Sequence, residues 1–283
     1  MNTKKTWLIT GASQGLGLAT VKYLLSREQQ VIATTRDADK FDPELRKRPG
    51  LEVISLDLTS EIAVQNTIEL IAAKYGRIDM LINNAGYGFA GAIEEASEAE
   101  VAKVLAINVE ATLRMIRYVL PVMRQAGSGH IINLSSNAGL VSTPGFGIYN
   151  ASKYAVEGLS EALYHEVKDL GIKVTLIEPG AFRTNFLASS LAIAERSIAD
   201  YDATAGNFKN RLRTNNGHQP GDPERAVEAI IRVAEMEHPP LRLLLGQDAY
   251  LRVYQKLADM SAEFEAHKSI TLSTGFEPAT IDN

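Results

Sequence analysis

Short hydrophobic runs alternate along this chain with longer segments in which hydrophobic residues recur every three or four positions. The short runs, such as Met80 to Ile82 and Ile131 to Ile132, stay apolar instead of alternating with polar residues. Continuous apolar runs are typical of parallel strands that helices cover on both faces. The pattern therefore predicts seven strands, at residues 6–10, 30–36, 51–57, 78–83, 130–136, 172–178 and 241–245.

The longer segments lie between these strands and carry hydrophobic residues at the spacing of one helix face. We expect covering helices at residues 15–27, 61–75, 98–124, 148–170 and 222–237. Strands that alternate with helices form a parallel sheet, because each connection crosses over the sheet before the next strand begins. The predicted fold class is α/β, with a doubly wound, seven-stranded parallel sheet between two helical layers and a single domain over residues 1–283.

Two segments depart from this alternation of strands and helices. Residues 182–219 follow a Pro-Gly turn, mix apolar residues with Arg, Asn and Ser, and contain no predicted strand. A long excursion in a compact domain is usually functional, so we expect residues 185–220 to form a lid over a substrate site. The tail, residues 269–283, lacks periodicity. We expect it to be poorly ordered or to dock on a neighbouring subunit.

Composition and charge narrow the classes of function. The formal net charge of the 283-residue chain is -5, which argues against nucleic-acid or anionic-membrane partners and favours a small molecule. No cysteine occurs, so disulfides and thiolate chemistry are excluded, and the five histidines lack metal-ligand spacing, so we expect no metal site. The first residues lead directly into a short strand, without a signal sequence or a membrane span. We expect a cytoplasmic protein.

A glycine-rich turn joins the first predicted strand to the first predicted helix. Its sequence from Thr10 to Gly17 is TGASQGLG, with glycines at 11, 15 and 17. Glycines permit a tight turn and a close approach of backbone to a pyrophosphate, and the following helix N-terminus favours an anion. The spacing differs from the commoner Gly-x-Gly-x-x-Gly fingerprint, and a turn without a ligand is the alternative. Its place near the N-terminus favours dinucleotide binding.

The end of the second predicted strand is where such a fold reads the adenosine ribose. An acidic residue there would bind both ribose hydroxyls and repel a 2′-phosphate. Thr35 stands at the strand end and Arg36 follows it. Because a guanidinium can bind a phosphate through two hydrogen bonds, we favour NADP over NAD. Two alternatives stay open: Asp37 in the acidic position, which would favour NAD, and Arg36 as an ordinary surface charge.

Tyr149 and Lys153 are four residues apart in a predicted helix, so the phenol and the ammonium lie on one face. Such a pair can transfer a proton, because an adjacent ammonium favours the phenolate form of a group whose pKa is ordinarily near 10. The same spacing also occurs as a half-buried ring beside a solvated charge. The pair alone therefore does not decide between catalysis and packing.

Taken together, the motifs in residues 6–185 resemble those of the short-chain dehydrogenase/reductase family. They occur in the order of that family, and the resemblance implies a Rossmann fold that binds a nicotinamide dinucleotide. The motifs are Thr10-Gly11-x3-Gly15-x-Gly17, Asp57, Asn83-Asn84-Ala85-Gly86, Asn108, Ser136, Tyr149-x3-Lys153, Pro179-Gly180 and Thr184.

The resemblance implies four catalytic residues. Tyr149 would be the general acid/base, and Lys153 would tune the phenol and hold the nicotinamide ribose. Ser136 would bind the substrate oxygen, with Ser135 as the competing candidate. Asn108 would anchor a water that passes protons to Lys153, although a buried Asn that kinks an apolar helix is an alternative reading.

The resemblance also implies the cofactor contacts. Asp57 would bond the adenine amino group, unless it only caps the next helix. Pro179-Gly180 would pass the nicotinamide, with Phe182 backbone and the Thr184 hydroxyl near its carboxamide, or would serve only as a turn. The family more often has a β-branched residue at the position of Phe182. The full predicted set is Gly11, Ser13, Gln14, Gly15, Leu16, Gly17, Arg36, Asp57, Leu58, Asn84, Ala85, Gly86, Tyr149, Lys153, Pro179, Gly180, Phe182 and Thr184.

Substrate specificity is expected from residues 87–91, residues 140–146 and the lid, which contribute apolar side chains to the predicted pocket. A bulky ketone or secondary alcohol, such as a steroid- or retinoid-like compound, would suit such a pocket, although the same residues could merely pack the lid. The predicted substrate contacts are Ser136, Tyr149, Phe89, Leu140, Phe146, Phe186 and Leu187, with Val141 and Leu191 nearby.

The family often assembles through the two long helices predicted at residues 98–124 and 148–170, so a homodimer or homotetramer is expected. Their apolar faces could equally pack on their own sheet. Two rival functions remain at this stage. A catalytically silent NADP sensor would not need the Ser, Tyr, Lys and Asn set. A nucleotide-sugar epimerase would need a larger C-terminal domain.

Overall fold

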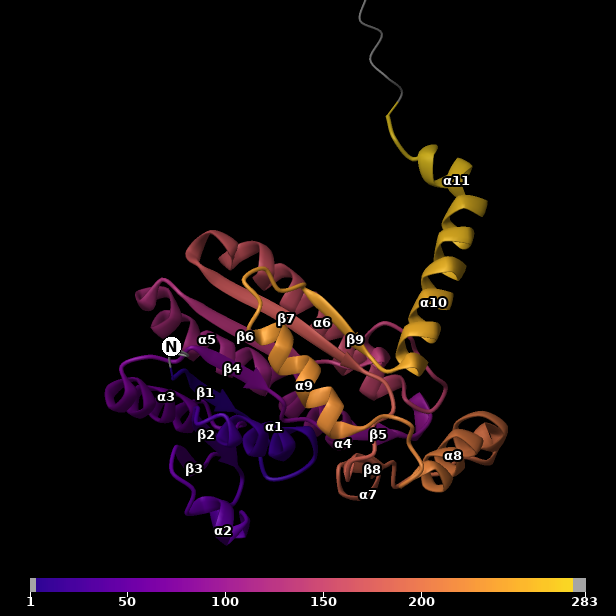
Figure 1. Cartoon of the computed structure of the whole chain (residues 1–283). Helices are drawn as coiled ribbons and strands as arrows, with labels where there is room; N and C mark the ends of the chain where they lie inside the picture. The colour runs from indigo at the N-terminus through magenta and orange to yellow at the C-terminus, as the bar shows by residue number, and fades with distance from the viewer. Residues whose placement is uncertain (1–3, 277–283) are drawn as a thin grey trace, which may run out of the picture.

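The computed structural model describes residues 4–276. Seven parallel strands form the central sheet, as the hydrophobic runs predict, and their ends differ from the predicted ones by at most two residues (Figure 1). The strands are β1 (Thr6–Ile9), β2 (Gln30–Thr35), β3 (Leu51–Ser55), β4 (Met80–Asn83), β6 (Gly129–Leu134), β7 (Ile172–Pro179) and β9 (Arg242–Leu245).

The strand order is β3-β2-β1-β4-β6-β7-β9, and every neighbouring pair is parallel. The chain runs outward from β1 to β3 and then returns to place β4 on the other side of β1. The connections therefore diverge between β1 and β4. A crevice opens at the carboxyl ends of strands at such a switch point, where ligands of doubly wound sheets bind.

Helices cover both faces of the sheet and enclose two hydrophobic cores. On one face, α1 and α9 bury residues such as Leu24 and Ile230 against the strands. On the other face, α3, α5 and α6 bury residues such as Ile68, Val119 and Leu163. Strand residues alternate between these cores, as Trp7 and Leu8 of β1 do, which explains the continuous apolar runs. The bounds are α1 (Gly15–Ser26), α3 (Glu61–Tyr75), α5 (Ala111–Ala126), α6 (Gly147–Val167) and α9 (Pro223–Ala234).

The predicted helix at residues 98–124 is interrupted, which corrects the prediction. It consists of α4 (Glu98–Leu105), a π-helical turn η3 (Ala106–Glu110) and α5. The turn holds Asn108, which is 1% exposed and whose side chain bonds to the backbone of Tyr87. A π-turn adds one residue to the helix and shifts the face on which the following residues lie. Hydrophobic periodicity did not reveal it, because the inserted turn is short.

The excursion contains a strand that we did not predict. β8 (Leu191–Ile193) pairs in parallel with β5 (Gly88–Ala90) and forms a second, two-stranded sheet. These three-residue segments are too short to show a recognisable pattern. The short helices α7 (Phe186–Ser189) and α8 (Asn207–Asn215) complete the excursion, and α2 (Pro43–Arg46) follows β2 elsewhere in the chain.

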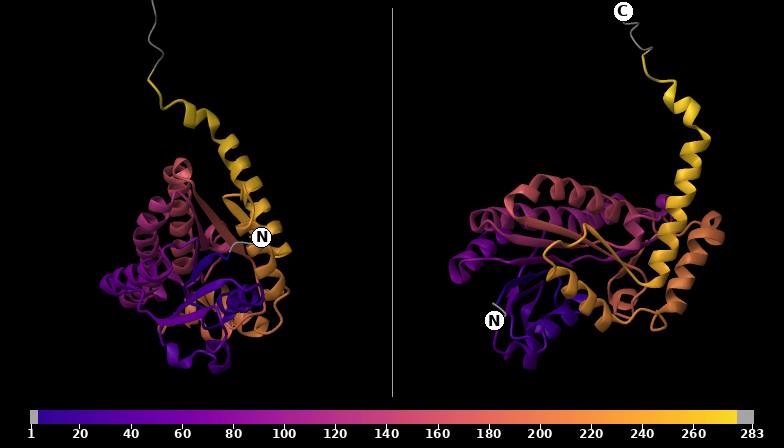
Figure 2. Two further views of the ribbon diagram at one scale, coloured as in Figure 1. Left: turned by 60° about the vertical axis from the view of Figure 1, so that its left-hand side comes forward. Right: turned by 45° about the horizontal axis from the view of Figure 1, so that its top comes forward.

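A long C-terminal helix was also absent from the prediction. α10 (Gln247–Ala266) follows β9, and α11 (Lys268–Leu272) continues it. Both extend away from the body of the molecule in every view (Figures 1 and 2). Residues 269–272, which we placed in a poorly ordered or docked tail, are therefore helical and exposed. The predicted tail also includes residues 277–283, which lie outside the described residues.

Candidate active site

A cavity of about 850 Å³ opens at the carboxyl ends of β1, β2, β4, β6 and β7. Its volume suits a dinucleotide together with a small substrate. The lid helices α7 and α8 and the first turns of α10 close other sides of it. Most predicted site residues line this cavity: Gly11, Ser13, Gln14, Gly15, Leu16, Arg36, Asp57, Leu58, Asn84, Ala85, Gly86, Ser136, Phe146, Tyr149, Lys153, Pro179, Gly180, Phe182, Thr184, Phe186 and Leu187.

Four predicted residues do not line the cavity. Phe89 is 2% exposed in β5 and packs with Val104 and Ala194 in a small core, so its assignment as a substrate contact is corrected. Leu140 is also absent from the lining, and its carbonyl accepts a hydrogen bond from the Tyr154 hydroxyl. Asn108 and Gly17 lie behind the cavity wall. Their effect on the site is exerted through the residues that they support.

The glycine turn is held in place by Asn84. The Asn84 side-chain amide donates to the carbonyl oxygens of Thr10 and Gly11, at 2.9 Å each. A Cβ at Gly17 would lie 2.5 Å from the Asn84 amide nitrogen, so only glycine fits where α1 passes the turn. Gly11 has φ +63°, a conformation that favours glycine. Asn84, predicted as a direct cofactor contact, therefore also builds the turn.

The N-terminus of α1 provides a site for a phosphate. Its N-cap, Gln14, makes no capping hydrogen bond with its side chain, and the first turn carries no acidic residue. Free backbone N–H groups and the helix dipole thus point toward the cavity, which favours an anion. The Gln14 side chain instead bonds to Ser189 and Ser190 at the end of α7, which links the turn to the lid. The turn fits a dinucleotide pyrophosphate.

Arg36 and Asp37, the two candidates for contact with the adenosine ribose, have different surroundings. Arg36 is exposed and lines the cavity beyond β2. Asp37 does not line it: its carboxylate accepts from the Asp39 backbone and pairs with Lys40 at 2.9 Å. These contacts lower the pKa of Asp37, chiefly through the Lys40 hydrogen bond. Among residues 4–276, Arg36 is therefore the cation at this end of the cavity, and Asp37 is engaged outside it.

Asp57 lines the adenine end of the cavity. Its carboxylate accepts from the backbone and the hydroxyl of Thr59, at 2.9 and 2.7 Å. The hydrogen bonds from Thr59 lower the pKa of Asp57, so it is an acceptor at neutral pH. The following helix, α3, is capped by Ser60 and not by Asp57. The alternative reading of Asp57 as a helix cap is therefore wrong.

Tyr149 stands in a row of aromatic rings at the other end of the cavity. Its ring centroid lies 5.0 Å from that of Phe146 and 6.0 Å from that of Phe186. Phe208 of α8 continues the row, 4.7 Å from Phe146. The phenol is 5% exposed. A reacting group beside Tyr149 would thus lie between apolar walls that exclude water.

Burial dominates the proton affinities of the Tyr149 and Lys153 side chains. It raises the pKa of Tyr149 to about 12, although the Ser136 hydroxyl opposes this shift. Burial also lowers the pKa of Lys153 to about 8, against the charge of Glu157. The Lys153 ammonium donates to the Leu134 carbonyl at 2.8 Å and lies 5.8 Å from the Tyr149 ring centroid. Desolvation is thus the dominant cause for the phenol, and the hydrogen bond with Ser136, not the charge of Lys153, is what opposes it.

The two candidate serines point to different neighbours. The Ser136 hydroxyl accepts from the Ala138 backbone at 3.1 Å and interacts with the phenol of Tyr149. The Ser135 hydroxyl is buried beside Gly139, where a Cβ would lie 2.7 Å from it. The Ser135 hydroxyl is thus next to Gly139 and interacts with Glu157, although Ser135 also lines the cavity. Ser136 is the serine that interacts with the Tyr149 phenol, in agreement with its choice from the sequence.

Asn108 and Lys153 approach each other across Gly86. A Cβ at Gly86 would lie 3.3 Å from the Asn108 amide oxygen and 3.6 Å from the Lys153 ammonium. The Asn108 amide nitrogen also donates to the Ser152 hydroxyl at 3.1 Å, which ties the π-turn to α6. The arrangement agrees with a supporting role next to Lys153.

The comparisons with known proteins agree with this geometry. The family model described as short chain dehydrogenase matches residues 5–193. The protein named oxidoreductase BOA17 of Botryotinia fuckeliana is 35% identical over 272 residues, which cover 95% of this chain and 99% of the relative. The 3-ketodihydrosphingosine reductase of Bacteroides thetaiotaomicron is 37% identical over 243 residues, or 84% and 87% of the two chains. The chain belongs to the short-chain dehydrogenase family.

Solved structures of this family resemble the dehydrogenase closely. A short-chain dehydrogenase from Streptomyces avermitilis has a TM-score of 0.91 and 38% identity, and the match covers 97% of this chain and 100% of that one. ElxO with NADP bound has a TM-score of 0.71 and 27% identity, covering 86% and 97%. A Burkholderia phymatum family member in complex with NAD has a TM-score of 0.80 and 25% identity, covering 92% and 95%. A nicotinamide cofactor is thus supported, whereas the choice between NADP and NAD is left to the residues of this chain.

Sequence reasoning missed a buried carboxyl pair next to Lys153. Glu157 is one turn beyond Lys153 in α6, and Glu178 is in β7; they are 5% and 1% exposed. Arg242 of β9 lies 3.1 Å from Glu157 and 3.5 Å from Glu178. Burial and the neighbouring Glu157 raise the pKa of Glu178 to about 8. The spacing of Lys153 and Glu157 was a usable signal, whereas the approach of Glu178 required the tertiary structure.

The sequence also failed to indicate the contribution of α10. Asp248 and Arg252 of this helix line the cavity. The Asp248 carboxylate accepts from the Ala181 backbone at 2.8 Å and holds the loop after β7. A Cβ at Gly180 would lie 2.3 Å from Asp248, so glycine is required there. The first turns of α10 thus shape the end of the cavity at which Tyr149 stands.

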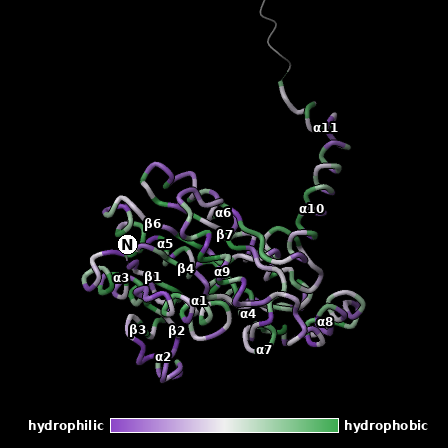
Figure 3. Tube along the Cα trace, in the orientation of Figure 1, coloured by the Kyte–Doolittle hydropathy of each residue, from purple (hydrophilic) through white to green (hydrophobic). Residues whose placement is uncertain are grey.

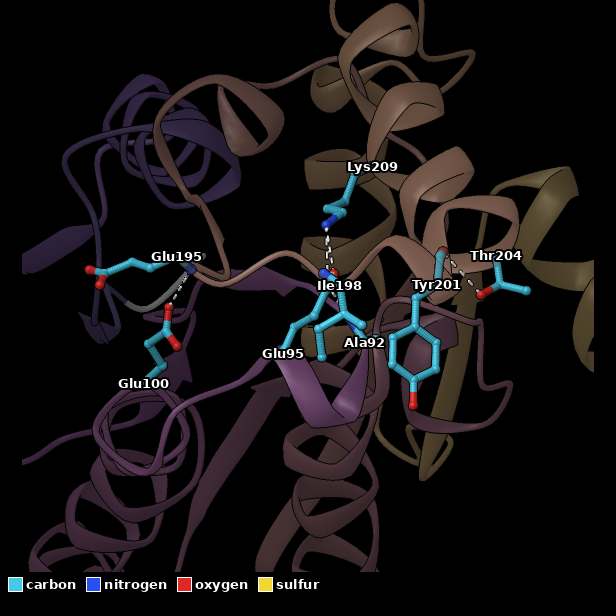
Figure 4. A network of polar contacts seen from close by, with 8 residues as sticks. All are labelled: Ala92, Glu95, Glu100, Glu195, Ile198, Tyr201, Thr204 and Lys209. Atoms are coloured by element: carbon cyan, nitrogen blue, oxygen red, sulfur yellow. Dashed lines mark hydrogen bonds and ion pairs between the residues drawn. The ribbon is translucent and has the colours of Figure 1, made fainter.

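The lid is attached to the body by carboxylates on η2 (Ile93–Glu95) and α4 (Figure 4). Glu95 accepts from the Ile198 backbone at 3.0 Å and pairs with Lys209 of α8 at 3.1 Å. Glu95 is 2% exposed, so this ion pair is buried. Glu100 accepts from the Glu195 backbone at 3.1 Å. These contacts hold Phe208 and its helix over the cavity.

None of the helices within residues 4–276 is long and apolar enough to cross a membrane.

Proposed function

We propose that this dehydrogenase uses NADP to interconvert a bulky, apolar ketone and its secondary alcohol. The observation that carries the proposal is one continuous cavity with a dinucleotide turn at one end and Tyr149, Lys153 and Ser136 at the other. A reduced nicotinamide bound there would supply the hydride for the carbonyl carbon. The chain's own residues would orient the two reactants and deliver the proton.

Three side chains have distinct roles in the proposed proton transfer. The Tyr149 phenol, with a pKa of about 12, remains protonated at neutral pH and gives its proton to the carbonyl oxygen as negative charge develops. The Ser136 hydroxyl donates a hydrogen bond to the same oxygen. The Lys153 ammonium stabilises the phenolate that is left and, supported by Asn108, returns a proton to it. In the oxidative direction the same groups act in reverse.

The cofactor preference rests on Arg36. Its guanidinium lies at the cavity wall beyond β2, while the Asp37 carboxylate is engaged by Asp39 and Lys40. A cation can hold the 2′-phosphate of NADP, and Asp37, the acidic candidate for the ribose hydroxyls, does not line the cavity. NADP therefore fits this end better than NAD.

The aromatic row indicates the class of substrate. Phe146 and Phe186 flank Tyr149, Phe208 packs against Phe146, and Leu187 and Leu212 extend the apolar lining. A small polar substrate would leave this surface exposed to water, whereas a steroid-like, retinoid-like or long-chain ketone would cover it. The similarity to a 3-ketodihydrosphingosine reductase adds a long-chain ketone to the substrates to be tested.

The direct test combines a substrate panel with one variant. We expect nicotinamide absorbance to change with NADPH and bulky apolar ketones, and Tyr149→Phe to lose turnover by about 10²-fold or more while it keeps NADPH affinity. The phenylalanine preserves the aromatic row and removes only the proton. Full activity in this variant would refute the mechanism. Binding of NADPH without turnover of any carbonyl compound would instead favour a sensor.

The cofactor assignment is tested by Arg36→Ala. Loss of the guanidinium should raise the Kd of NADPH by roughly 10- to 100-fold, as for other charged hydrogen bonds, and leave that of NADH nearly unchanged. The matched control is Arg46→Ala, an exposed arginine that pairs with Asp39 and does not line the cavity. An equal effect of Arg36→Ala on both cofactors would overturn the preference for NADP.

A further inference from the structure

The C-terminal helices form an arm with no hydrophobic core of its own. Within α10, only Ala249 and Val253 are buried. From residue 261 to residue 276 every residue is exposed. Beyond the first turns of α10, the arm extends away from the body in all views (Figures 1 and 2). Beyond Val253 no residue of α10 is buried, and a helical segment of the remaining length is only marginally stable in water without packing. A packing partner would therefore stabilise the arm.

The arm carries an unusual share of the exposed apolar surface. Half of the sixteen large hydrophobic residues that are exposed within residues 4–276 lie between residues 250 and 276. By contrast, α5 and α6 contribute only Leu113 and Tyr154, although family resemblance placed the subunit contacts on these helices. Hydrophobic residues recur along α10 and α11 in the hydropathy colouring (Figure 3). The exposed residues of the arm are Tyr250, Leu251, Tyr254, Leu257, Phe264, Ile270, Leu272 and Phe276.

Part of this surface forms a stripe along α10. Tyr250, Tyr254, Leu257, Ser261 and Phe264 follow one another at alternating steps of four and three residues, which places them on one helix face. The Tyr250 and Tyr254 rings already pack together, with centroids 4.3 Å apart. The stripe is the seam expected of two helices that pack lengthwise.

The order of residues in the stripe is self-complementary. If two copies pack antiparallel about an axis at Leu257, Tyr250 of each copy lies opposite Phe264 of the other. The large Tyr254 lies within one residue of the small Ser261 on the partner's stripe, so that the second ring has space. Such an isologous contact closes on itself and gives a dimer and not a filament.

We propose that α10 forms an antiparallel helix pair with α10 of a second copy of this chain, with Leu257 at the two-fold axis. Covering the exposed parts of Tyr250, Tyr254, Leu257 and Phe264 on both copies would bury on the order of 1,000 Å². This area is at the lower limit for a specific interface, and contacts of α11 with the partner's body would add to it. Asp248 and Arg252, in the first turns of the same helix, line the cavity, so the dimer contact also braces the active site.

The alternative occupant of the stripe is a membrane surface, and the charge of the helix disfavours it. α10 holds four acidic residues against two basic ones, a net charge of -2, and helices that bind anionic bilayers are basic.

The first test is the mass of the full chain by sedimentation velocity. We expect twice the mass of one chain for the unchanged protein and the mass of one chain for Leu257→Glu, with the circular dichroism spectrum preserved. Gln255→Glu, which introduces the same charge at an exposed residue off the stripe, should remain dimeric. A monomeric unchanged protein, or a Leu257→Glu variant that remains dimeric, would overturn the proposal. Binding of the unchanged protein to anionic vesicles at the expense of the dimer would do the same.

The absence of cysteine allows a second test. Leu257→Cys places a single thiol at the proposed axis, next to its own copy in the partner. Mild oxidation should then join two chains covalently, because the two sulfur atoms meet within disulfide range. Gln255→Cys should remain uncrosslinked. No disulfide-linked dimer with Leu257→Cys, or equal crosslinking in both variants, would contradict the two-fold axis whether or not the enzyme is active.

Discussion

At the scale of single residues, burial decides the proton affinities of Tyr149 and Lys153. The 6% exposed Lys153 ammonium would lose more of its charge if Glu157 did not lie one helical turn away. Glu157 in turn faces Arg242, while Glu178, with its pKa raised to about 8, holds a proton at neutral pH. Glu157, whose own pKa is raised by burial against the opposing effect of Arg242, is the carboxyl group whose charge raises the pKa of Lys153. It acts as a positioning residue, because it does not line the cavity.

The variant Glu157→Gln should therefore change the pH profile of the reaction. Removing the carboxylate lowers the pKa of Lys153 further below about 8, so the ammonium is lost at a lower pH. We expect the alkaline decline of carbonyl reduction to move toward acid by roughly 0.5 to 1 pH unit. The measurement is kcat/KM from pH 6 to 10. The control is Glu161→Gln, which loses a bond to the same Arg242 at an exposed site. Coincident profiles for the two variants would remove the role of Glu157.

At the scale of elements, the lid depends on a few polar contacts instead of a large core. β8 has only three residues, and α8 buries no residue of its own. The lid is held by Glu95, which bonds both the Ile198 backbone and Lys209. A buried carboxylate with these partners gives a defined closed position, because losing one partner would leave a charge without compensation.

Weakening this attachment should affect substrate binding more than cofactor binding. Glu95→Gln keeps the shape of the side chain but removes the charge that pairs with Lys209. We expect the KM of a bulky ketone to rise by about fivefold, which corresponds to about 1 kcal/mol in favour of the open lid. The Kd of NADPH should not change. Glu94→Gln alters an exposed contact with Tyr201 and serves as the control. An unchanged KM in Glu95→Gln would show that Glu95 does not control the lid.

At the scale of the whole molecule, a buried histidine links stability to pH. His130 in β6 is 2% exposed and lies 2.9 Å from the Thr175 hydroxyl of β7. Burial lowers its pKa from 6.5 to about 4. At a pH between these two pKa values, the unfolded chain therefore binds more protons than the folded chain. Stability from His130 is complete above pH 6.5 and decreases as the pH falls toward 4.

The expected contribution of His130 is about 3 kcal/mol, from a shift of roughly 2.5 pH units. In His130→Gln the free energy of unfolding should therefore decline less between pH 7 and pH 4.5 than in the unchanged protein. Urea denaturation at the two pH values measures the difference. His218→Gln, at an exposed histidine, should decline like the unchanged protein. Parallel declines for His130→Gln and the unchanged protein would refute this linkage.

Most of the scaffold could be read directly from local patterns. The seven strands and the covering helices follow from hydrophobic periodicity, because the positions that face the sheet are set by the geometry of each element. The residues of the turn and of the Tyr149 helix could be identified because their spacing is local, as Gly11 to Gly17 and Tyr149 to Lys153 show. The π-turn at Asn108 and the three-residue strand β8 are too short to produce a pattern.

The sequence by itself thus determined the sheet, the glycine turn after β1 and the placement of Tyr149 and Lys153 on one face of a helix. The tertiary structure decided which candidates meet. In the folded chain, the Asp37 carboxylate accepts a hydrogen bond within a turn, whereas Arg36 lines the cavity. Phe89 is buried and does not line the cavity. The tertiary structure also brought Glu178 to Glu157 and α10 to the cavity across long stretches of chain. The physical reason is that spacing along a chain fixes neighbours within one element, whereas desolvation, charge pairing and pocket shape depend on elements that approach only when the chain folds.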